Sequence, residues 1–168
     1  MISVSSTIGS EGKTFVSANL AAIMAMSGKK VLLMGLDLRK PRIHRILGTE
    51  NKTGISNFLI GEEKFDDVIV ESEVDNLWYA SAGPVPPNPA ELIESEAMKD
   101  FIEMAKKKFD YIIIDTPPVA IVTDALLVSS FTDFYLFVVR QRYTTKNTIE
   151  LLEELRRNNS IKKHGNCG

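Results

Sequence analysis

The sequence has a single cysteine among its 168 residues, so no disulfide can form within the chain. It also has no apolar run near the eighteen or so residues needed to cross a bilayer, and no signal-peptide pattern. Because stable disulfides belong to oxidising compartments, this cysteine usage favours a reducing cytoplasm. We interpret Cys167 as inert, since no oriented base is evident near it.

The sequence also has no large excess of positive or negative charge. Its 20 Lys and Arg nearly balance its 22 Asp and Glu, and the net charge is -2. The chain as a whole therefore lacks the basic footprint of a nucleic-acid-binding protein. Its 44% hydrophobic and 25% charged residues are ordinary for a globular protein of about one domain. With no internal repeat, low-complexity segment or linker, we expect a single domain over residues 1–168.

Short apolar runs alternate with helical patterns along the chain. The runs, typical of buried parallel strands, are 1–6, 31–36, 76–81, 111–115 and 134–139. The helical patterns begin near Lys13 and cover 95–109 and about 145–158. This alternation predicts an α/β fold, a doubly wound and mainly parallel sheet with helices on both faces.

Residues 7–14 read TIGSEGKT and lie between the first strand and a long helix, where such sheets bind ligands. A P-loop needs small residues that turn backbone amides onto phosphates, a lysine for the β and γ oxygens, and a hydroxyl for Mg2+. The strict pattern has Ala or Gly at its first position, which is Thr7 here. The residues predicted to bind the nucleotide are Gly9, Ser10, Glu11, Gly12, Lys13, Thr14 and Phe15.

Aspartates end two of the predicted strands. Asp115 closes YIIID and is followed by Pro117 and Pro118, so its carboxylate should project towards the same crevice as the P-loop. A Walker B aspartate holds Mg2+ and its waters from this position, although a solvated aspartate before a turn fits the pattern too. Asp37 ends its own apolar run in the same manner.

Four segments, SSTIGSEGKTFVSANLA, VLLMGLDLRKP, AGPVPPNPAEL and YIIIDTPPVAIVTDA, resemble the cytoplasmic domain of bacterial tyrosine kinases (BY-kinases) of capsule and exopolysaccharide biosynthesis. The resemblance runs from residue 3 to about residue 146. It implies a P-loop NTPase fold and an ATP-dependent protein tyrosine kinase that uses ATP or ADP with Mg2+. It also implies catalytic roles for Lys13, Asp37 and Asp115, and metal ligation by Thr14, Asp37 and Asp115, with Asp37 in Walker A' and Asp115 in Walker B.

The resemblance implies partners as well. These are a membrane-embedded polysaccharide chain-length or export protein, or a fused transmembrane region, which would hold the domain at the inner face of the plasma membrane. The full-length protein would be a homo-oligomer that phosphorylates the tyrosine-rich tail of a neighbouring subunit, with no nucleic-acid partner.

This sequence departs from the family in three ways. It lacks the upstream oligomerisation helix and the C-terminal tyrosine cluster, so we expect a core fragment that is monomeric and lacks a final strand. We place its four tyrosines, Tyr79, Tyr111, Tyr135 and Tyr143, well inside the fold. Gly35 stands where the first aspartate of Walker A' belongs. A glycine there fits close backbone approach to the P-loop or ligand, and the loss of a carboxylate base predicts a slow kinase.

Two other classes of P-loop protein are alternatives, and one residue tells against each. The partition and division-site ATPases carry a signature lysine at the position that is Ile8 here. A GTPase would need an aspartate at the last position of an NKxD motif, where NKTG has Gly54. A non-catalytic nucleotide switch of a polysaccharide assembly remains an alternative.

Two weaker patterns complete the sequence. A basic run follows Asp37 and either steers phosphate or an acidic tyrosine tail, or forms a solvated face: Arg39, Lys40, Arg42, His44 and Arg45. Asn88, Pro89 and Glu91 predict a helix start with a capping box.

Overall fold

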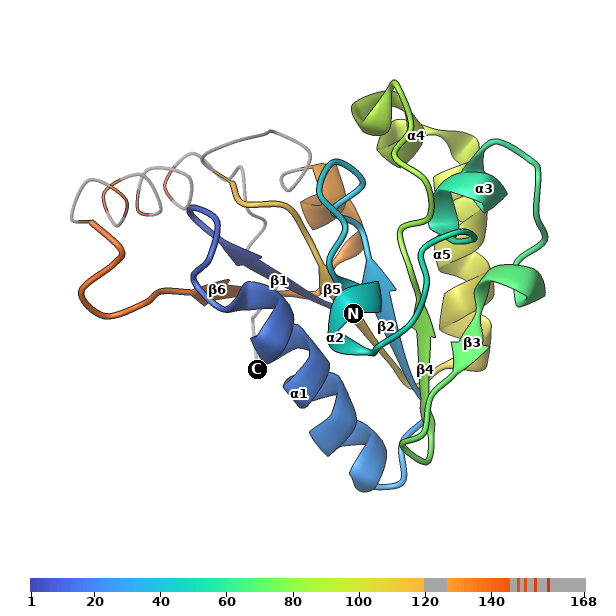
Figure 1. Cartoon of the computed structure of the whole chain (residues 1–168), viewed down its shortest axis with the longest axis horizontal. Helices are drawn as coiled ribbons and strands as arrows, with labels where there is room; N and C mark the ends of the chain where they lie inside the picture. The colour runs from blue at the N-terminus through green and yellow to red at the C-terminus, as the bar shows by residue number, and fades with distance from the viewer. Residues whose placement is uncertain (120–126, 146–147, 149, 151–152, 154–156, 158–168) are drawn as a thin grey trace.

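The computed structural model describes residues 1–119, 127–145, 148, 150, 153 and 157. Within this part of the chain, six strands form one sheet in the order β3-β4-β2-β5-β1-β6 (Figure 1). The strands are β1 (Ile2–Ser6), β2 (Val31–Gly35), β3 (Val70–Glu71), β4 (Leu77–Ala80), β5 (Tyr111–Asp115) and β6 (Phe134–Val138). Neighbours are parallel except β3, which pairs antiparallel with β4. Each strand predicted from an apolar run is confirmed, whereas the two-residue β3 was not predicted.

Helices cover both faces of the sheet, as expected for a doubly wound fold (Figure 1). They are α1 (Lys13–Met26), α2 (Ile43–Ile46), α3 (Ile55–Leu59), α4 (Pro89–Glu94) and α5 (Glu96–Lys108), with 3-10 turns η1 (Asp66–Val68) and η2 (Ser129–Phe131). α1 packs on one face of the sheet, and α5 packs on the opposite face. None of the described helices has the length and apolar character needed to cross a membrane.

The two faces divide the core because successive side chains of a strand point to opposite sides. In β2, Leu32 and Met34 join the cluster under α5, whereas Val31 and Leu33 join the cluster under α1. All four side chains are fully buried, and burying one such side chain stabilises the fold by about 1.5–3 kcal/mol. The continuous apolar run of β2 is therefore a consequence of having a helix on each side.

Two predicted helix starts have different caps. The helix predicted over 95–109 is confirmed as α5, where Ser95 Oγ accepts a hydrogen bond from Met98 N at 3.2 Å. α4 begins after Asn88 as predicted, but the expected capping box is wrong. Asn88 Nδ2 donates to Glu91 Oε2 at 2.7 Å, so the two side chains bond each other instead of the backbone.

The helix predicted over 145–158 falls mostly outside the described residues, and Cys167 lies outside them altogether. The residues of this range that the structure describes beyond Thr145 are helical: Thr148, Glu150, Glu153 and Arg157.

Candidate active site

The predicted P-loop connects the end of β1 to the start of α1, at the carboxyl edge of the sheet. Gly12 precedes the helix with a φ of 94°, in the left-handed region where a glycine avoids the strain of a Cβ. Lys13 and Thr14 follow as the first two residues of α1, and both are buried. The loop thus lies where parallel α/β sheets bind ligands, as the sequence predicted.

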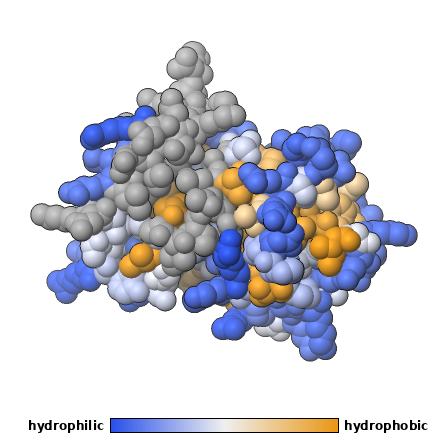
Figure 2. Space-filling view, turned by 90° about the horizontal axis from the view of Figure 1, so that it is seen from above, coloured by the Kyte–Doolittle hydropathy of each residue, from blue (hydrophilic) through white to orange (hydrophobic). Residues whose placement is uncertain are grey.

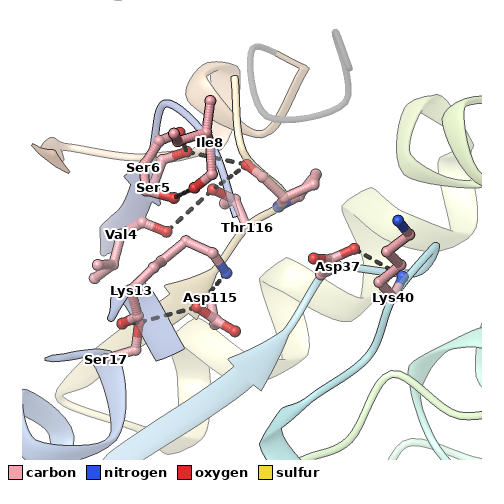
Figure 3. A network of polar contacts seen from close by, with 11 residues as sticks. Val4, Ser5, Ser6, Ile8, Lys13, Ser17, Asp37, Lys40, Asp115 and Thr116 are labelled. Carbon is pink, nitrogen blue, oxygen red and sulfur yellow. Dashed lines mark hydrogen bonds and ion pairs between the residues drawn. The ribbon is translucent and has the colours of Figure 1, made fainter. Parts of the chain in front are cut away.

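Lys13 and Asp115 form a buried ion pair at the base of this loop (Figure 3). Lys13 Nζ donates to Asp115 Oδ1 at 2.6 Å, and the two side chains are 9% and 2% exposed. Ser17 Oγ donates to the same carboxylate oxygen at 3.2 Å from one helical turn further along α1. Sequence reasoning missed Ser17, although its i+4 spacing from Lys13 is a usable signal.

Asp37 lies beyond the end of β2, and its carboxylate faces the same region (Figure 3). Its Oδ1 accepts a hydrogen bond from Lys40 N at 3.0 Å. Burial raises the pKa of Asp37, and the negative charge of Asp115 raises it further; the amide of Lys40 and the charge of Lys13 oppose the shift. Two carboxylates close enough to repel one another are a suitable environment for a cation.

Hydroxyl groups fasten the P-loop to the segment that follows β5. Thr116 Oγ1 donates to Val4 O at 3.0 Å, and Ser5 Oγ donates to Pro117 O at 3.0 Å. Ser6 Oγ donates to Ile8 O at 2.8 Å inside the loop itself (Figure 3). These bonds fix the start of the P-loop relative to Asp115, and the sequence pattern gave no direct indication of them.

Glu11 is placed differently from the other residues predicted to bind the nucleotide. Its side chain is buried, and its Oε2 accepts from Thr7 N at 2.8 Å and from Ile8 N at 3.0 Å. Its Oε1 accepts a hydrogen bond from Thr144 Oγ1. Glu11 therefore holds the shape of the loop, which suits a carboxylate better than direct contact with phosphate of like charge.

The segment after β6 lies against the outer side of the P-loop. Arg140 Nη1 donates to Ser10 O at 3.2 Å, and the Tyr143 hydroxyl donates to Gly9 O at 3.2 Å. Tyr143 is 43% exposed, so the expectation that every tyrosine lies well inside the fold is wrong. No local pattern around residue 140 predicts this contact, because it joins segments far apart in the sequence.

A cavity of about 510 Å³ opens between the P-loop, the segment after β2 and the segment after β5. Its lining includes most of the predicted nucleotide-binding residues: Gly9, Ser10, Gly12, Lys13, Thr14 and Phe15. Asp37 lines it as well, together with the basic residues Arg39, Lys40, Arg42 and Arg45. The structure therefore brings the predicted site residues together around one cavity, apart from the inward-turned Glu11 and the buried Asp115, whose carboxylate bonds Lys13.

The residues at this cavity fit a nucleotide-bound Mg2+ better than a metal held by protein alone. No group of three or more His, Cys, Asp and Glu suited to a metal occurs in the described part of the chain. Mg2+ accompanying a nucleotide commonly uses one or two carboxylates and completes its shell with waters and phosphates. Asp37 and the Thr14 hydroxyl line the cavity and match that smaller set. Asp115 lies behind them with one oxygen bonded to Lys13.

Gly35 has a packing role that differs from the predicted one. A Cβ built at this position would lie 3.3 Å from both Ala82 N and Ile43 Cδ1, and 3.6 Å from Ala80 O. The close neighbours are thus the end of β4 and a side chain of α2. The predicted close backbone approach is therefore that of Ala80 and Ala82 rather than of the P-loop, and approach to a ligand stays a prediction.

Comparison with known proteins agrees with this geometry. A family model described as AAA domain matches residues 1–165. The tyrosine-protein kinase ptk of Acinetobacter johnsonii is 38% identical over 151 residues, which cover 90% of this chain and 21% of that protein. The chain thus spans about a fifth of the length of this relative.

Solved structures show the same relationship at the level of the fold. The chimerical protein CapA2B2 matches with a TM-score of 0.92 and 36% identity, over 98% of this chain and 73% of its own. The kinase domain of the Escherichia coli tyrosine kinase ETK matches with a TM-score of 0.90 and 32% identity, over 96% and 63%. The chain therefore belongs to the AAA domain family and, within it, to the bacterial tyrosine kinases (BY-kinases) with a P-loop NTPase fold.

Proposed function

We propose that the chain is the nucleotide-binding core of an ATP-dependent protein tyrosine kinase of a capsule or exopolysaccharide system. The observation that carries this proposal is the buried Lys13–Asp115 pair beside Asp37, at the edge of a cavity bounded by the P-loop. In phosphoryl transfer the protein mainly positions reactants and stabilises charge, so these few groups suffice for the chemistry.

Each group has a distinct role in the proposal. Lys13 and the loop amides bind the phosphates of ATP, and Asp115 holds the Lys13 ammonium at the base of the loop in the absence of nucleotide. Thr14, Asp37 and Asp115 would hold Mg2+, which neutralises charge on the phosphate oxygens when it is bound. Asp37 is the nearest candidate to accept the proton of the tyrosine hydroxyl, because Gly35 has no side chain to do so.

Calorimetric titration with MgADP tests the nucleotide site. Lys13→Met removes a charged hydrogen-bond donor, which is worth about 1.5–3 kcal/mol, and should weaken binding by roughly ten- to 150-fold. The exposed Lys52→Met is a matched control, and its affinity should be unchanged. Equal affinities of the original chain and Lys13→Met would show that Lys13 does not face a phosphate.

The partners belong to the same proposal. A membrane-embedded polysaccharide export protein or a fused transmembrane region would place the domain at the inner face of the plasma membrane. A chain extended by its family's flanking segments should assemble into homo-oligomers and phosphorylate the tyrosine-rich tail of a neighbour, whereas residues 1–168 alone should be monomeric. Light scattering of both proteins tests this difference.

A second function, a nucleotide-dependent switch without phosphotransfer, is favoured by Gly35. This residue removes a carboxylate that the kinase pattern has close to the reacting groups. The switch predicts MgATP binding with no transfer to tyrosine, so a phosphotransfer assay separates the two functions.

A further inference from the structure

The cavity concentrates positive charge that the composition of the chain does not predict. Five of its fifteen lining residues are Lys or Arg, and Asp37 is its one acidic lining residue. The chain as a whole carries a net charge of -2. Four of these cations, Arg39, Lys40, Arg42 and Arg45, lie together on the segment between β2 and the end of α2. The segment therefore presents a local basic surface in an acidic protein.

All four cations are exposed while Asp37 beside them is buried, and we name Lys40, Arg42 and Arg45, whose side chains form no ion pair with a described residue, the basic rim. Arg45 N donates to Arg42 O at 3.0 Å, so Arg42, which precedes α2, and Arg45 within it lie one turn apart. Hydrophilic residues also occupy most of the outline of the molecule seen from above, beyond the grey atoms (Figure 2). Because the three rim residues are exposed and also line the cavity, the rim forms the solvent-facing edge of the cavity.

The charges of the rim are not used within the described part of the chain. Lys13 already has Asp115 as its partner, whereas Arg42 and Arg45 form no ion pair with another described residue. Burial lowers the pKa of the neighbouring His44, and the positive charge of Arg45 lowers it further. The rim is therefore a cluster of exposed positive charges without ion-pair partners among the described residues.

The position of the rim beside Asp37 indicates which part of a protein substrate would contact the rim. Lys40 donates its backbone amide to Asp37 Oδ1 at 3.0 Å, which joins the rim directly to the carboxylate expected at the metal. The acceptor tyrosine must reach the transferable phosphate at this metal, so the residues beside that tyrosine would pass over the rim. The phosphates of the nucleotide would be bound by the P-loop amides and Lys13, which belong to a different segment of the cavity lining.

We propose that the basic rim recognises acidic residues that flank the acceptor tyrosine in the protein substrate. This inference rests on the proposed kinase function and adds a substrate class to it. Guanidinium groups pair with carboxylates through two parallel hydrogen bonds, which gives Arg42 and Arg45 a specific geometry for aspartate and glutamate. One exposed pair contributes little, so the preference depends on several pairs acting together.

Fluorescence anisotropy with three labelled peptides tests the proposal. Each peptide has one tyrosine, flanked by three glutamates, three serines or three lysines, and the protein is the full chain with MgADP. We expect the acidic peptide to bind most tightly, with an affinity that falls as salt screens exposed charges. Arg42→Gln with Arg45→Gln should weaken it about two- to thirtyfold, whereas lysine at both positions keeps the charge but not the paired hydrogen bonds and should weaken it less.

Lys106→Gln with Lys107→Gln is the matched control, since it removes two exposed charges from the end of α5, on the other face of the sheet. This control should bind the acidic peptide as the original chain does. Equal losses in the two double variants would reduce the effect to net charge and overturn the proposal. No preference for the acidic peptide, or a loss of MgADP affinity in the Arg42 and Arg45 variant, would overturn it too.

The kinase proposal has a separate outcome. If the original chain fails to bind MgADP, the proposed function fails, while the preference among peptides is still measurable without nucleotide. If the chain binds MgADP but the rim substitutions do not change its affinity for the acidic peptide, the kinase proposal stands. Only the recognition of acidic residues is then overturned.

Discussion

Lys13 and Asp115 are 102 residues apart in the sequence, yet Lys13 Nζ lies 2.6 Å from Asp115 Oδ1 in a buried ion pair. This contact joins the first turn of α1 to the end of β5, and so connects the predicted phosphate-binding and metal-binding groups. Removing one partner of a buried pair leaves a charge without compensation.

Lys13→Met should therefore lower the free energy of unfolding by about 3 kcal/mol or more, even without nucleotide. Lys13→Met with Asp115→Asn removes both charges and should cost less than the sum of the two single changes. Urea unfolding of the four proteins measures this coupling. Additive losses would mean that the two groups do not interact in solution.

Glu11 should stabilise the conformation of the P-loop. Glu11→Ala removes the acceptor for two loop amides and for Thr144, and should destabilise the fold by about 1.5–3 kcal/mol. Hydrogen exchange should accelerate at Thr7 and Ile8, whereas Glu11→Gln, which retains one acceptor oxygen, should preserve much of their protection. The exposed Glu73→Ala is the control. Unchanged exchange at these two amides in Glu11→Ala would contradict the contact.

Gly35 should be required by packing against Ile43. Gly35→Ala places a Cβ 3.3 Å from Ile43 Cδ1 and from the backbone of Ala82, and overpacking of this kind costs about 1–3 kcal/mol. Ile43→Val removes the Cδ1 atom, so it should recover part of this loss in the double variant, as measured by thermal unfolding. A double variant no more stable than the sum of the single changes would show that Ile43 does not set the limit.

Tyr135 should make the free energy of unfolding depend on pH in the alkaline range. Burial raises the pKa of Tyr135 to about 12, against the hydrogen bonds of Ser5 and Thr116, whereas an unfolded tyrosine has a pKa of about 10. The folded chain thus holds this proton more tightly, and its contribution is complete below pH ~10 and lost as the pH rises towards 12.

Urea unfolding of the original chain and of Tyr135→Phe at pH 8 and pH 11.5 tests the direction of this pH dependence. The difference in stability between the original chain and this variant should shrink by about 2 kcal/mol at the higher pH. Tyr111→Phe is the control because this ring is at the surface. A difference that stays constant would contradict the shifted pKa.

The fold could be predicted from the sequence because its central strands, such as β2 and β5, are buried on both faces. β2 and β5 are apolar throughout or nearly so, and each ends close to a polar residue of the site. The two-residue β3 gave no such signal, since a strand this short at the edge of a sheet has no periodicity to detect.

The candidate site was predictable where one segment holds the chemistry, as in Gly12, Lys13 and Thr14. The contacts of Tyr143 and Thr144 with the P-loop depend on long-range packing that no local spacing encodes. The segments that approach Gly35 could not be predicted for the same reason, because Ile43 comes from α2 and Ala82 from just after β4.

Single-turnover transfer from γ-labelled MgATP to a tyrosine peptide tests the central claim most directly. We predict slow formation of phosphotyrosine that requires Lys13 and Asp37, because positioning contributes more than a base in a loose transition state. Lys13→Met and Asp37→Asn should each reduce the rate by about a hundredfold or more, the scale of a positioned catalytic group. Saturated MgATP binding with no phosphotyrosine from the original chain would contradict the kinase function and leave the nucleotide switch.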